Sequence, residues 1–274
     1  MSSGLQVADR LVWSLAKQCR HDDVLIVGVA TPIAAAAGML ARELLVPDLT
    51  VLVAASVQPR THDIAGPMLE PDFVARRSSG SFGQADVLDL LQRGGVTLQF
   101  VSPAQVDRKG RINSSEVPRP NGDMLRLPGP LALPDVSCLV GRLVGYKASH
   151  TRRFLVDEVD FVTGLGPADL DARSAAGLPG SGLLTVVTDL AVLRFEPTTG
   201  SVHLASLAPG VSEADVLAGC GFPLDVPDDV DIDEPMPPEA RELLDRVIDP
   251  HTIRGLEVPS ARAQAQSRLA ALTP

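Results

Sequence analysis

The sequence predicts an α/β protein in which a mainly parallel sheet is flanked by helices and carries an added β-hairpin region. Residues 22–30 (DDVLIVGVA) form a continuous apolar run, which is typical of a strand buried on both faces. A helical pattern over residues 31–45 and a second apolar strand over residues 47–56 follow, which indicates a right-handed strand–helix–strand unit. Runs of period-2 hydrophobicity flank the turn PTTG within residues 183–208 and predict an antiparallel hairpin.

Further elements follow from local signals along the chain. Thr31 and Pro32 are a capping residue and a first-turn proline, so they begin the helix of residues 31–45. Apolar spacing, caps and glycine stops predict helices at 7–19, 82–95, 212–221 and 237–248, strands at 96–107, 136–147 and 158–164, and a proline-rich irregular loop at 118–135. We expect a single domain over residues 1–258 and a C-terminal tail over residues 259–274, which is either a weak helix or a disordered end.

The composition argues against several classes of protein. Of the 274 residues, 45% are hydrophobic and only 3% are aromatic, so we expect a core of Leu, Val and Ala. The net charge of −10 argues against a nucleic-acid surface, which needs a basic patch. Cys19, Cys138 and Cys220 are far apart and form no C-x-x-C pair, so neither disulfides nor a metal site are indicated. Because the sequence shows neither a run of ~18 apolar residues nor a signal-peptide core, we expect a cytoplasmic protein that makes no membrane contact.

Two strand ends are candidates for a ligand site, because ligands of α/β proteins bind outside the carboxyl ends of strands. One strand ends in the small residues Ala54, Ala55 and Ser56. The other continues as GVATPIAAA, where Gly28 and Thr31 precede a helix N-terminus that favours an anionic or carbonyl oxygen. A tight connection, with a small-residue helix packed on the sheet, explains the second stretch equally well.

Five segments occur in an order that is specific for one fold and superfamily, although not for one reaction: PDLTVLVAAS, AQVDRKGRINSS, HTRRFLVDEVDFVTGLG, VVTDLAVLRFEPTTGSVHLASLAPGVSEADVLAGCGF and RELLDRVIDP. From about residue 20 to about residue 258 they resemble the β subunit of class I coenzyme A transferases of the glutaconate type. The resemblance implies the class I CoA-transferase (NagB/RpiA-like) fold. It also implies an α-type partner subunit, in a heterodimer or heterotetramer, and an acyl-CoA substrate. Coenzyme A is then part of the substrate, and no permanently bound cofactor is expected.

The closing segment PPEARELLDRVIDPHTIRGLEV is similar to another branch of the same superfamily. It resembles the β subunit of the steroid-ring-opening CoA-ester hydrolase of actinobacterial cholesterol catabolism. A third relative is the methylglutaconyl-CoA decarboxylase pair of myxobacteria. All three are complexes of an α-type and a β-type subunit that act on acyl-CoA thioesters.

The sequence departs from the transferase pattern at two places. In the transferases, a Glu after the strand that begins with PD attacks the thioester and becomes a glutamyl-CoA intermediate. That position is Ala54 here, and its methyl group can neither attack nor transfer a proton. Ser56 would need a nearby base to replace it, so a turn or capping role is favoured. The family's glycine-rich oxyanion loop corresponds to LPGPLALPD, where Gly129 matches but Pro130 has no N–H to donate.

His150, in the segment SHTRRF, is a candidate general base or ligand of a substrate carboxylate. The alternative is a histidine that is hydrogen-bonded at a strand end. Arg152 and its neighbour Arg153 suit the phosphate groups of CoA, because the guanidinium matches phosphate geometry. Alternatively, they form salt bridges, for example with Asp157 or Glu158.

The segment AQVDRKGRIN keeps four residues of the family motif, and we assign them two kinds of role. Gln105 is a candidate for lining the active-site cleft. Asp107, Gly110 and Asn113 are residue types that build turns, so structural roles are favoured. The glycines of residues 177–182 (GLPGSG) lack the Lys and Ser/Thr of a phosphate loop, so no nucleotide site is expected there.

Taken together, the sequence predicts the β subunit of a heteromeric CoA-transferase-like enzyme. Hydrolysis or C–C cleavage of an acyl-CoA, as in the steroid-ring hydrolase, is the preferred reaction because Ala54 replaces the nucleophile. CoA transfer to a carboxylate with a displaced nucleophile, and decarboxylation of an acyl-CoA, are alternatives. A third hypothesis is a non-catalytic structural partner of a catalytic α subunit. The acyl group cannot be read from the sequence. We expect apolar residues of the loop at 125–133 to contribute to the subunit interface.

Overall fold

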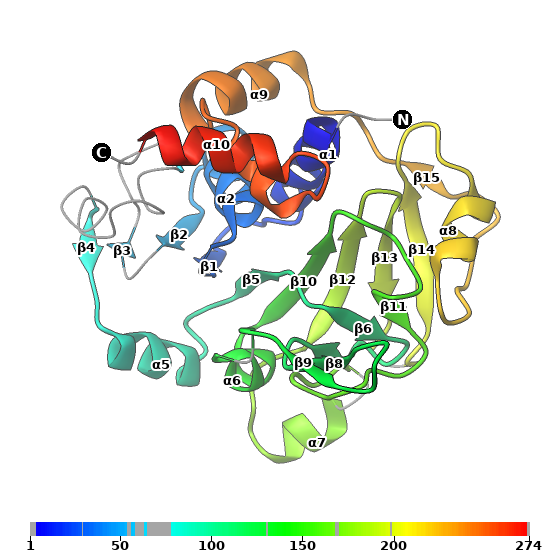
Figure 1. Ribbon diagram of the computed structural model, residues 1–274. Coiled ribbons are helices and arrows are strands. Elements are labelled where there is room, and N and C mark those ends of the chain that lie inside the picture. The colour runs from blue at the N-terminus through cyan, green and yellow to red at the C-terminus, as the bar shows by residue number, and fades with distance from the viewer. Residues whose placement is uncertain are drawn as a thin grey trace. The chain divides into compact units, whose positions relative to one another are not determined.

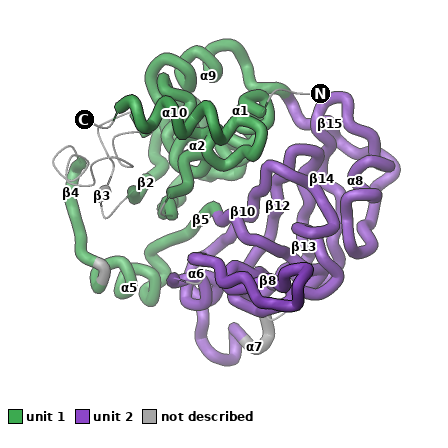
Figure 2. The backbone as a smooth tube through the Cα atoms, in the orientation of Figure 1, with its two compact units in different colours: residues 1–100, 235–274 green, residues 101–234 purple. Residues whose placement is uncertain are grey.

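The computed structural model describes residues 4–28, 30–53, 56–57, 63–64, 78–129, 131–167, 170–197 and 199–272 (Figure 1). The chain forms two compact units (Figure 2). Unit 1 consists of residues 1–100 and 235–274, and unit 2 consists of residues 101–234. Each unit is described below by itself. The single domain expected over residues 1–258 stays a prediction.

The sheet of unit 1 is built on parallel strands. β1 (Val24–Val27) pairs in parallel with β2 (Thr50–Val53) on one side and with β5 (Leu98–Val101) on the other. Two-residue strands β3 (Ser56–Val57) and β4 (Gly80–Ser81) extend the sheet in antiparallel fashion. This arrangement confirms the strand–helix–strand unit that the apolar runs predicted.

The helices of unit 1 come from both ends of the chain. They are α1 (Gly4–Ala16), α2 (Pro32–Leu44), α5 (Gln84–Gln92), α9 (Pro238–Leu243), the π-turn η2 (Leu244–Ile248), the 3₁₀ turn η3 (Ile253–Glu257) and α10 (Arg262–Leu272). The C-terminal elements therefore pack with α1 and α2, which begin the chain. Within the tail expected over residues 259–274, the structure has a helix, and Gly255 of η3 approaches it closely at Ala261 and Ala265.

Small residues let α2 lie directly on the sheet. Its first ten residues, Pro32–Ala41, are all buried. A Cβ added to Gly38 would lie 2.6 Å from Leu25 Cδ2 of β1, closer than side-chain atoms approach. A larger residue at position 38 would displace the Leu25 side chain, and the small residues of α2 agree with its close packing on β1.

Unit 2 contains a mixed sheet and two smaller ones. β10 (Arg142–Lys147) is parallel to β12 (Leu183–Thr188), and β13 (Ala191–Phe195) and β14 (Val202–Leu207) continue the sheet antiparallel. β15 (Asp231–Ile232) is parallel to β14. β11 (Leu155–Val156), β6 (Gln105–Asp107) and β7 (Ile112–Asn113) form a second sheet, and β8 (Glu116–Pro118) and β9 (Met124–Arg126) form a hairpin. The helices are α6 (Leu133–Leu139), α7 (Leu170–Ala175) and α8 (Glu213–Gly219).

The predicted hairpin of residues 183–208 is confirmed and contains one strand more than expected. β12, β13 and β14 form two successive antiparallel pairs, and the turn PTTG lies between the last two. Together with the parallel pairs of both units and the helices packed on them, this confirms the predicted α/β fold class.

Four parts of the chain differ from the sequence-based expectation. The strand expected at 96–107 is interrupted between β5 and β6, and the irregular loop expected at 118–135 contains β9 of the β8–β9 hairpin and the start of α6. The strand expected at 136–147 is divided, because Pro134 stands in the first turn of α6, where its missing N–H costs nothing. The strand proper begins only at Arg142. The strand expected at 158–164 is reduced to a single bridge between Ile112 and Gly164. Short apolar runs fit helix or strand equally well, and here the tertiary packing decides between them.

Candidate functional site

The candidate residues from the sequence are distributed over both units. Gly28, Thr31 and Ser56 belong to unit 1, whereas Gln105, Gly129, His150 and Arg152 belong to unit 2. Ala54, which stands at the position of the family's nucleophile, lies outside the described residues. For Ser56 the structure describes only its backbone in β3, and its proposed catalytic role stays a prediction.

Strands β1 and β2 end level with each other in unit 1. Val27 of β1 is paired with Val53 of β2, so the two strands end at the same edge of the sheet. Thr31 Oγ1 donates a hydrogen bond to the carbonyl oxygen of Gly28 at 2.7 Å. Ala30 between them has a left-handed backbone with φ 55°. Gly28 and Thr31 thus form the tight connection that was one of the two alternatives for this stretch.

The N-terminus of α2 is occupied by a carboxylate of the same chain. Glu257 Oε2 accepts a hydrogen bond from the backbone N–H of Ile33 at 2.7 Å. The first N–H groups of a helix have no partner within the helix, and the helix dipole favours a negative charge beside them. The geometry that favours an anionic oxygen is therefore present, and Glu257 supplies that oxygen from 224 residues away in the sequence. Direct contact of Gly28 and Thr31 with a ligand stays a prediction.

A buried charge network holds the segment that carries Glu257. Arg254 is fully buried and donates to Asp9 Oδ1 of α1 at 2.7 Å and to Asp249 Oδ2 at 2.9 Å. Asp245 accepts from the same guanidinium, and Arg241 donates to Asp9 Oδ2 at 2.6 Å. Burial raises the pKa of Asp249, although Arg254 acts to lower it. Burial acts to lower the pKa of Arg254, but the carboxylates of Asp9 and Asp249 raise it overall.

His150 is buried in unit 2 beneath α8, and both of its ring nitrogens are engaged. Nε2 lies 3.0 Å from the carbonyl oxygen of Val216, and Nδ1 lies 2.9 Å from Thr188 Oγ1. A carbonyl oxygen only accepts, so Nε2 carries the proton. The backbone N–H of His150 donates to Asp189 Oδ1 at 2.6 Å. These contacts are those of a histidine hydrogen-bonded at a strand end, and the general-base role stays a prediction.

Gln105 is engaged in a network of side chains at the edge of β6. Its Nε2 donates to Asp160 Oδ2 at 2.6 Å, and its Oε1 accepts from Asn113 Nδ2 at 2.7 Å. Asn113 Oδ1 in turn accepts from the backbone N–H of Ser115 at 3.0 Å. The contacts of Gln105 connect β6, β7 and the segment before Thr163, whereas a place in the substrate cleft stays a prediction.

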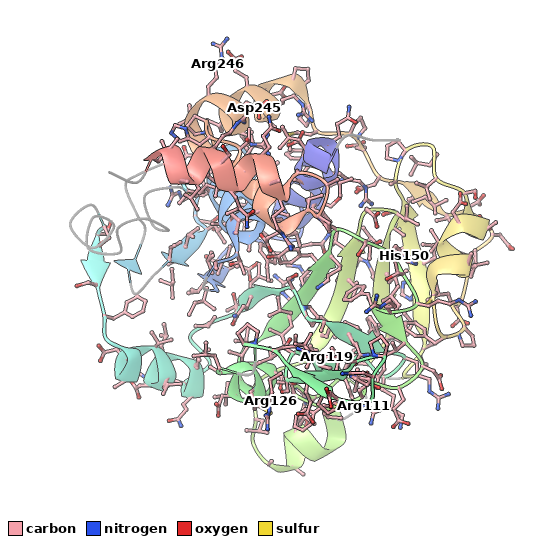
Figure 3. All side chains as sticks on the ribbon, in the orientation of Figure 1. Arg111, Arg119, Arg126, His150, Asp245 and Arg246 are labelled. Carbon is pink, nitrogen blue, oxygen red and sulfur yellow. The ribbon has the colours of Figure 1, made fainter. Side chains whose placement is uncertain are left out.

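Asp107 and Gly110 form the turn that the sequence predicted. Asp107 is fully buried, and its Oδ1 accepts from the backbone N–H groups of Lys109 at 2.9 Å and Arg111 at 3.0 Å. Gly110 has φ +71°, and an added Cβ would lie 2.5 Å from Pro167 Cδ. Burial acts to lower the pKa of Arg111, but its pairing with Asp107 raises that pKa overall. In the view of Figure 3, Arg111 and His150 lie in separate regions of unit 2.

Gly129 lies against Ser114, where a larger residue does not fit. An added Cβ would lie 2.6 Å from Ser114 Cβ and 2.9 Å from its carbonyl oxygen. The Ser114 N–H donates to Thr163 Oγ1 at 3.0 Å, so this junction joins three stretches of unit 2. Pro130 lies outside the described residues, and Leu131 is 87% exposed. Gly129 therefore has a packing role, and its predicted contact with the substrate stays a prediction.

Arg152 is exposed, and its Nε donates to the carbonyl oxygen of Ala218 at 3.0 Å. The acidic residues that were expected to pair with it have other partners. Asp157 lies 3.6 Å from Arg108, and Glu158 lies 3.1 Å from Arg111. Arg152 thus binds the end of α8, and its proposed contact with CoA phosphate stays a prediction.

The sequence did not identify Glu257, a carboxylate that contacts the N-terminus of α2 in unit 1. A signal for it exists in the sequence of α2. The first turn of that helix has no acidic residue, and within the described residues Thr31 makes no capping hydrogen bond. A helix N-terminus without a local cap predicts a partner from elsewhere in the chain, although the sequence does not say which residue supplies it.

Among residues 4–272, apart from those the structure leaves undescribed, two further classes of site are not found. There is no cluster of three or more His, Cys, Asp or Glu side chains that would hold a metal ion. In the same part of the chain, every helix is too short or too polar to cross a membrane.

Comparison with known proteins gives matches along nearly the whole chain, although no family model matches it. It is 28% identical to the B subunit of the 3-oxoadipate CoA-transferase of Pseudomonas knackmussii, over 96% of this chain and 98% of that protein. It is 26% identical to the B subunit of the glutaconate CoA-transferase of Acidaminococcus fermentans, over 86% of this chain and 90% of that protein. The crystal structure of the decarboxylase AibA/AibB superposes with a TM-score of 0.77 at 25% identity, covering 92% of this chain and 98% of the other.

These matches define the class of protein first: the chain has the fold of class I CoA-transferase subunits. Along nearly its whole length, the chain is similar to the B subunits of two CoA-transferases.

Proposed function

We propose that this chain is the B-type subunit of a heteromeric enzyme that acts on an acyl-CoA thioester and catalyses hydrolysis or C–C cleavage rather than CoA transfer. The observation that carries this proposal is Ala54. By resemblance, that position holds the Glu that attacks the thioester in the transferases. A methyl group has no lone pair, so the covalent glutamyl-CoA route is closed at this position.

The subunit's contribution is then to bind and orient the substrate. The engagement of His150 and Gln105 in hydrogen bonds within unit 2 supports this division of labour. The reacting groups would come from an α-type subunit in a heterodimer or heterotetramer. In hydrolysis, water adds its oxygen to the acyl carbon, the C–S bond breaks, and CoA leaves as the free thiol. Coenzyme A is part of the substrate in this scheme.

The comparisons favour two alternative reactions. The B-subunit relatives are named as transferases, which favours acyl transfer between CoA and a carboxylate with a displaced nucleophile. The neighbour AibA/AibB is named as a decarboxylase, which favours decarboxylation of an acyl-CoA on the same fold. A steroid-derived ring fragment as the acyl group is proposed from the resemblance of the closing segment, residues 237–258. A non-catalytic role as a structural partner agrees equally with the contacts of His150 and Gln105.

Co-expression with the α-type subunit from the neighbouring gene tests the proposal. We expect the purified pair to consume an acyl-CoA with no requirement for a carboxylate acceptor. Hydrolysis of the thioester would release free thiol, whereas C–C cleavage would give an altered acyl-CoA in which the thioester is intact. A pair that neither binds nor converts any CoA ester would contradict the proposal. Turnover that starts only when a free carboxylate is added would favour transfer instead.

The substitution Ala54→Glu, with Ala54→Gln as its matched control, tests whether the missing carboxylate at position 54 is what prevents the covalent route. We expect only Ala54→Glu to give a CoA thioester adduct on this chain, because only it restores a nucleophilic carboxylate. Adduct formation by the unsubstituted chain would show that another residue is the nucleophile.

A further inference from the structure

The N-terminus of α2 is capped by the carboxylate of Glu257, which is distant in the sequence. Pro32 has no N–H, so the N–H of Ile33 is the first backbone donor of the helix. That donor is bound by Glu257 Oε2 at 2.7 Å. Both residues belong to unit 1, so this contact lies within one compact unit.

The segment that presents Glu257 is held rigidly from several sides. Thr252 has a left-handed backbone with φ 55°, which is uncommon for a β-branched residue and is found where the surroundings impose it. Arg268 of α10 donates to Thr252 Oγ1. Asp249 accepts from the backbone N–H of Ile253 at 2.7 Å, and the buried Arg254 binds both Asp249 and α1. These contacts tie η3, the 3₁₀ turn that ends at Glu257, to α1, to α10 and to Asp249.

The contact of Glu257 lies at the strand edge that the proposed chemistry would use. The turn at 28–31 leaves β1 after Val27, which is paired with Val53, and residue 54 follows Val53 directly. The turn itself contains the left-handed Ala30 and the hydrogen bond from Thr31 to Gly28. Glu257 binds the helix that follows Ala30 and Thr31, so it holds the start of α2 close in sequence to the edge at which β1 ends beside Val53.

We infer that Glu257 is a positioning residue, which fixes the turn at 28–31 by occupying the anion-binding N-terminus of α2. This inference rests on the proposed function, because the turn matters for catalysis only if the strand edge is part of the active site. The carboxylate also neutralises the positive end of the helix dipole. A free substrate carboxylate, such as the acceptor that CoA transfer needs, therefore finds this site already occupied.

The experiment compares Glu257→Ala, Glu257→Gln and the control Glu234→Ala in the complex with the α-type subunit. Glu234 is an exposed carboxylate outside this contact. We expect Glu257→Ala to lower kcat by roughly tenfold to a hundredfold, with a smaller change in KM, because a displaced turn misorients the reacting groups. Glu257→Gln should lose less, since its amide oxygen still accepts from Ile33. Formate at tens of millimolar should restore part of kcat in Glu257→Ala, because it is a small carboxylate that fits the vacated position.

A second readout does not depend on activity. Without substrate, formate should raise the melting temperature of Glu257→Ala while leaving the unsubstituted protein and Glu234→Ala unchanged, because only Glu257→Ala has a vacant anion site. Unchanged kcat and KM in Glu257→Ala would overturn the positioning role, even if formate stabilises it. If the unsubstituted pair converts no CoA ester, the proposed function fails, and the melting experiment then decides the capping assignment: a formate-dependent rise supports it, and no rise overturns it.

Discussion

Helices α2 and α8 are capped at their N-termini in opposite ways. In α8, the cap is local: Ser212 Oγ accepts from the N–H of Asp215 at 3.2 Å, and Asp215 Oδ2 accepts from the N–H of Ser212 at 3.3 Å. In α2, the cap is Glu257, from the other end of the chain. A local capping box makes a helix start that is independent of the rest of the fold. A distant cap makes the start of α2 depend on the C-terminal segment.

The same contrast holds for the two buried aspartate–arginine pairs. Asp107 and Arg111 are four residues apart and close their own turn in unit 2. Asp9 and Arg254 are 245 residues apart and join α1 to η3 in unit 1. Within unit 1, contacts between the N-terminal and C-terminal parts of the chain therefore join α1 to η3 and η3 to the start of α2. Figure 3 labels Asp245, which accepts a hydrogen bond from Arg254, and the next residue, Arg246.

The largest expected loss of stability comes from removing Arg254, which makes the long-range ion pair with Asp9 in unit 1. Arg254→Met removes the guanidinium that pairs with the buried Asp249, and it leaves Asp9 paired with Arg241. Removing one partner of a buried ion pair costs about 3–5 kcal/mol. We expect the free energy of unfolding in urea to fall by that amount. The control is Arg246→Met, which removes an exposed pair with Glu242 and should cost about 1 kcal/mol or less. Equal effects of the two substitutions would contradict the assigned role of Arg254.

A smaller loss of stability is expected from substitution of His150, which is hydrogen-bonded to the Val216 carbonyl oxygen of α8. His150→Gln breaks at least one of the contacts to Val216 and Thr188 and leaves a buried polar group unpaired. We expect a loss of about 1–3 kcal/mol in unfolding free energy. The kcat of the complex should stay within about threefold, because the enzyme keeps its reacting groups. If kcat falls far more than this while stability is unchanged, His150 is a catalytic residue and its structural assignment is wrong.

The smallest effect is expected at the local cap itself. Ser212→Ala removes the side chain that accepts from Asp215, and loss of such a cap costs about 1 kcal/mol.

The hydrogen bond from the Ser212 side chain lowers the pKa of Asp215 below its usual value. A carboxyl with a lowered pKa in the folded state stabilises the fold above its unfolded pKa, and that contribution is lost as the pH falls through the folded value. The difference in stability between the parent chain and Asp215→Asn should therefore shrink on acidification below about pH 4. A difference that is constant with pH would contradict this.

The features that the sequence predicted correctly depend on neighbouring residues. The apolar runs of β1 and β2, the hairpin with PTTG, the Ser212 cap and the turn at Asp107 all carry their signal within a few positions. The division of the strand expected at 136–147 was not predicted, because a short apolar run does not specify helix or strand. The hairpin of β8 and β9 was missed because prolines and polar residues make residues 116–126 resemble an irregular loop.

The features of the candidate site that the sequence missed depend on long-range contacts. Glu257 meets α2, and Arg254 meets Asp9, across more than 200 positions. No local pattern encodes such a pairing, although the absence of an acidic residue in the first turn of α2 indicates that a partner is needed. By contrast, the replacement at Ala54 is visible in the sequence as soon as the family resemblance is recognised.

The most direct test of the central claim is the mass of this chain during turnover. The complex would be quenched with borohydride or hydroxylamine while it consumes an acyl-CoA, and the intact mass of each subunit would then be measured. Because Ala54 cannot form a thioester, we predict that this chain keeps its unmodified mass while substrate is consumed. A mass decrease on this chain after borohydride, from reduction of a carboxyl thioester to the alcohol, would contradict the account, and so would a mass increase after hydroxylamine, from formation of a hydroxamate.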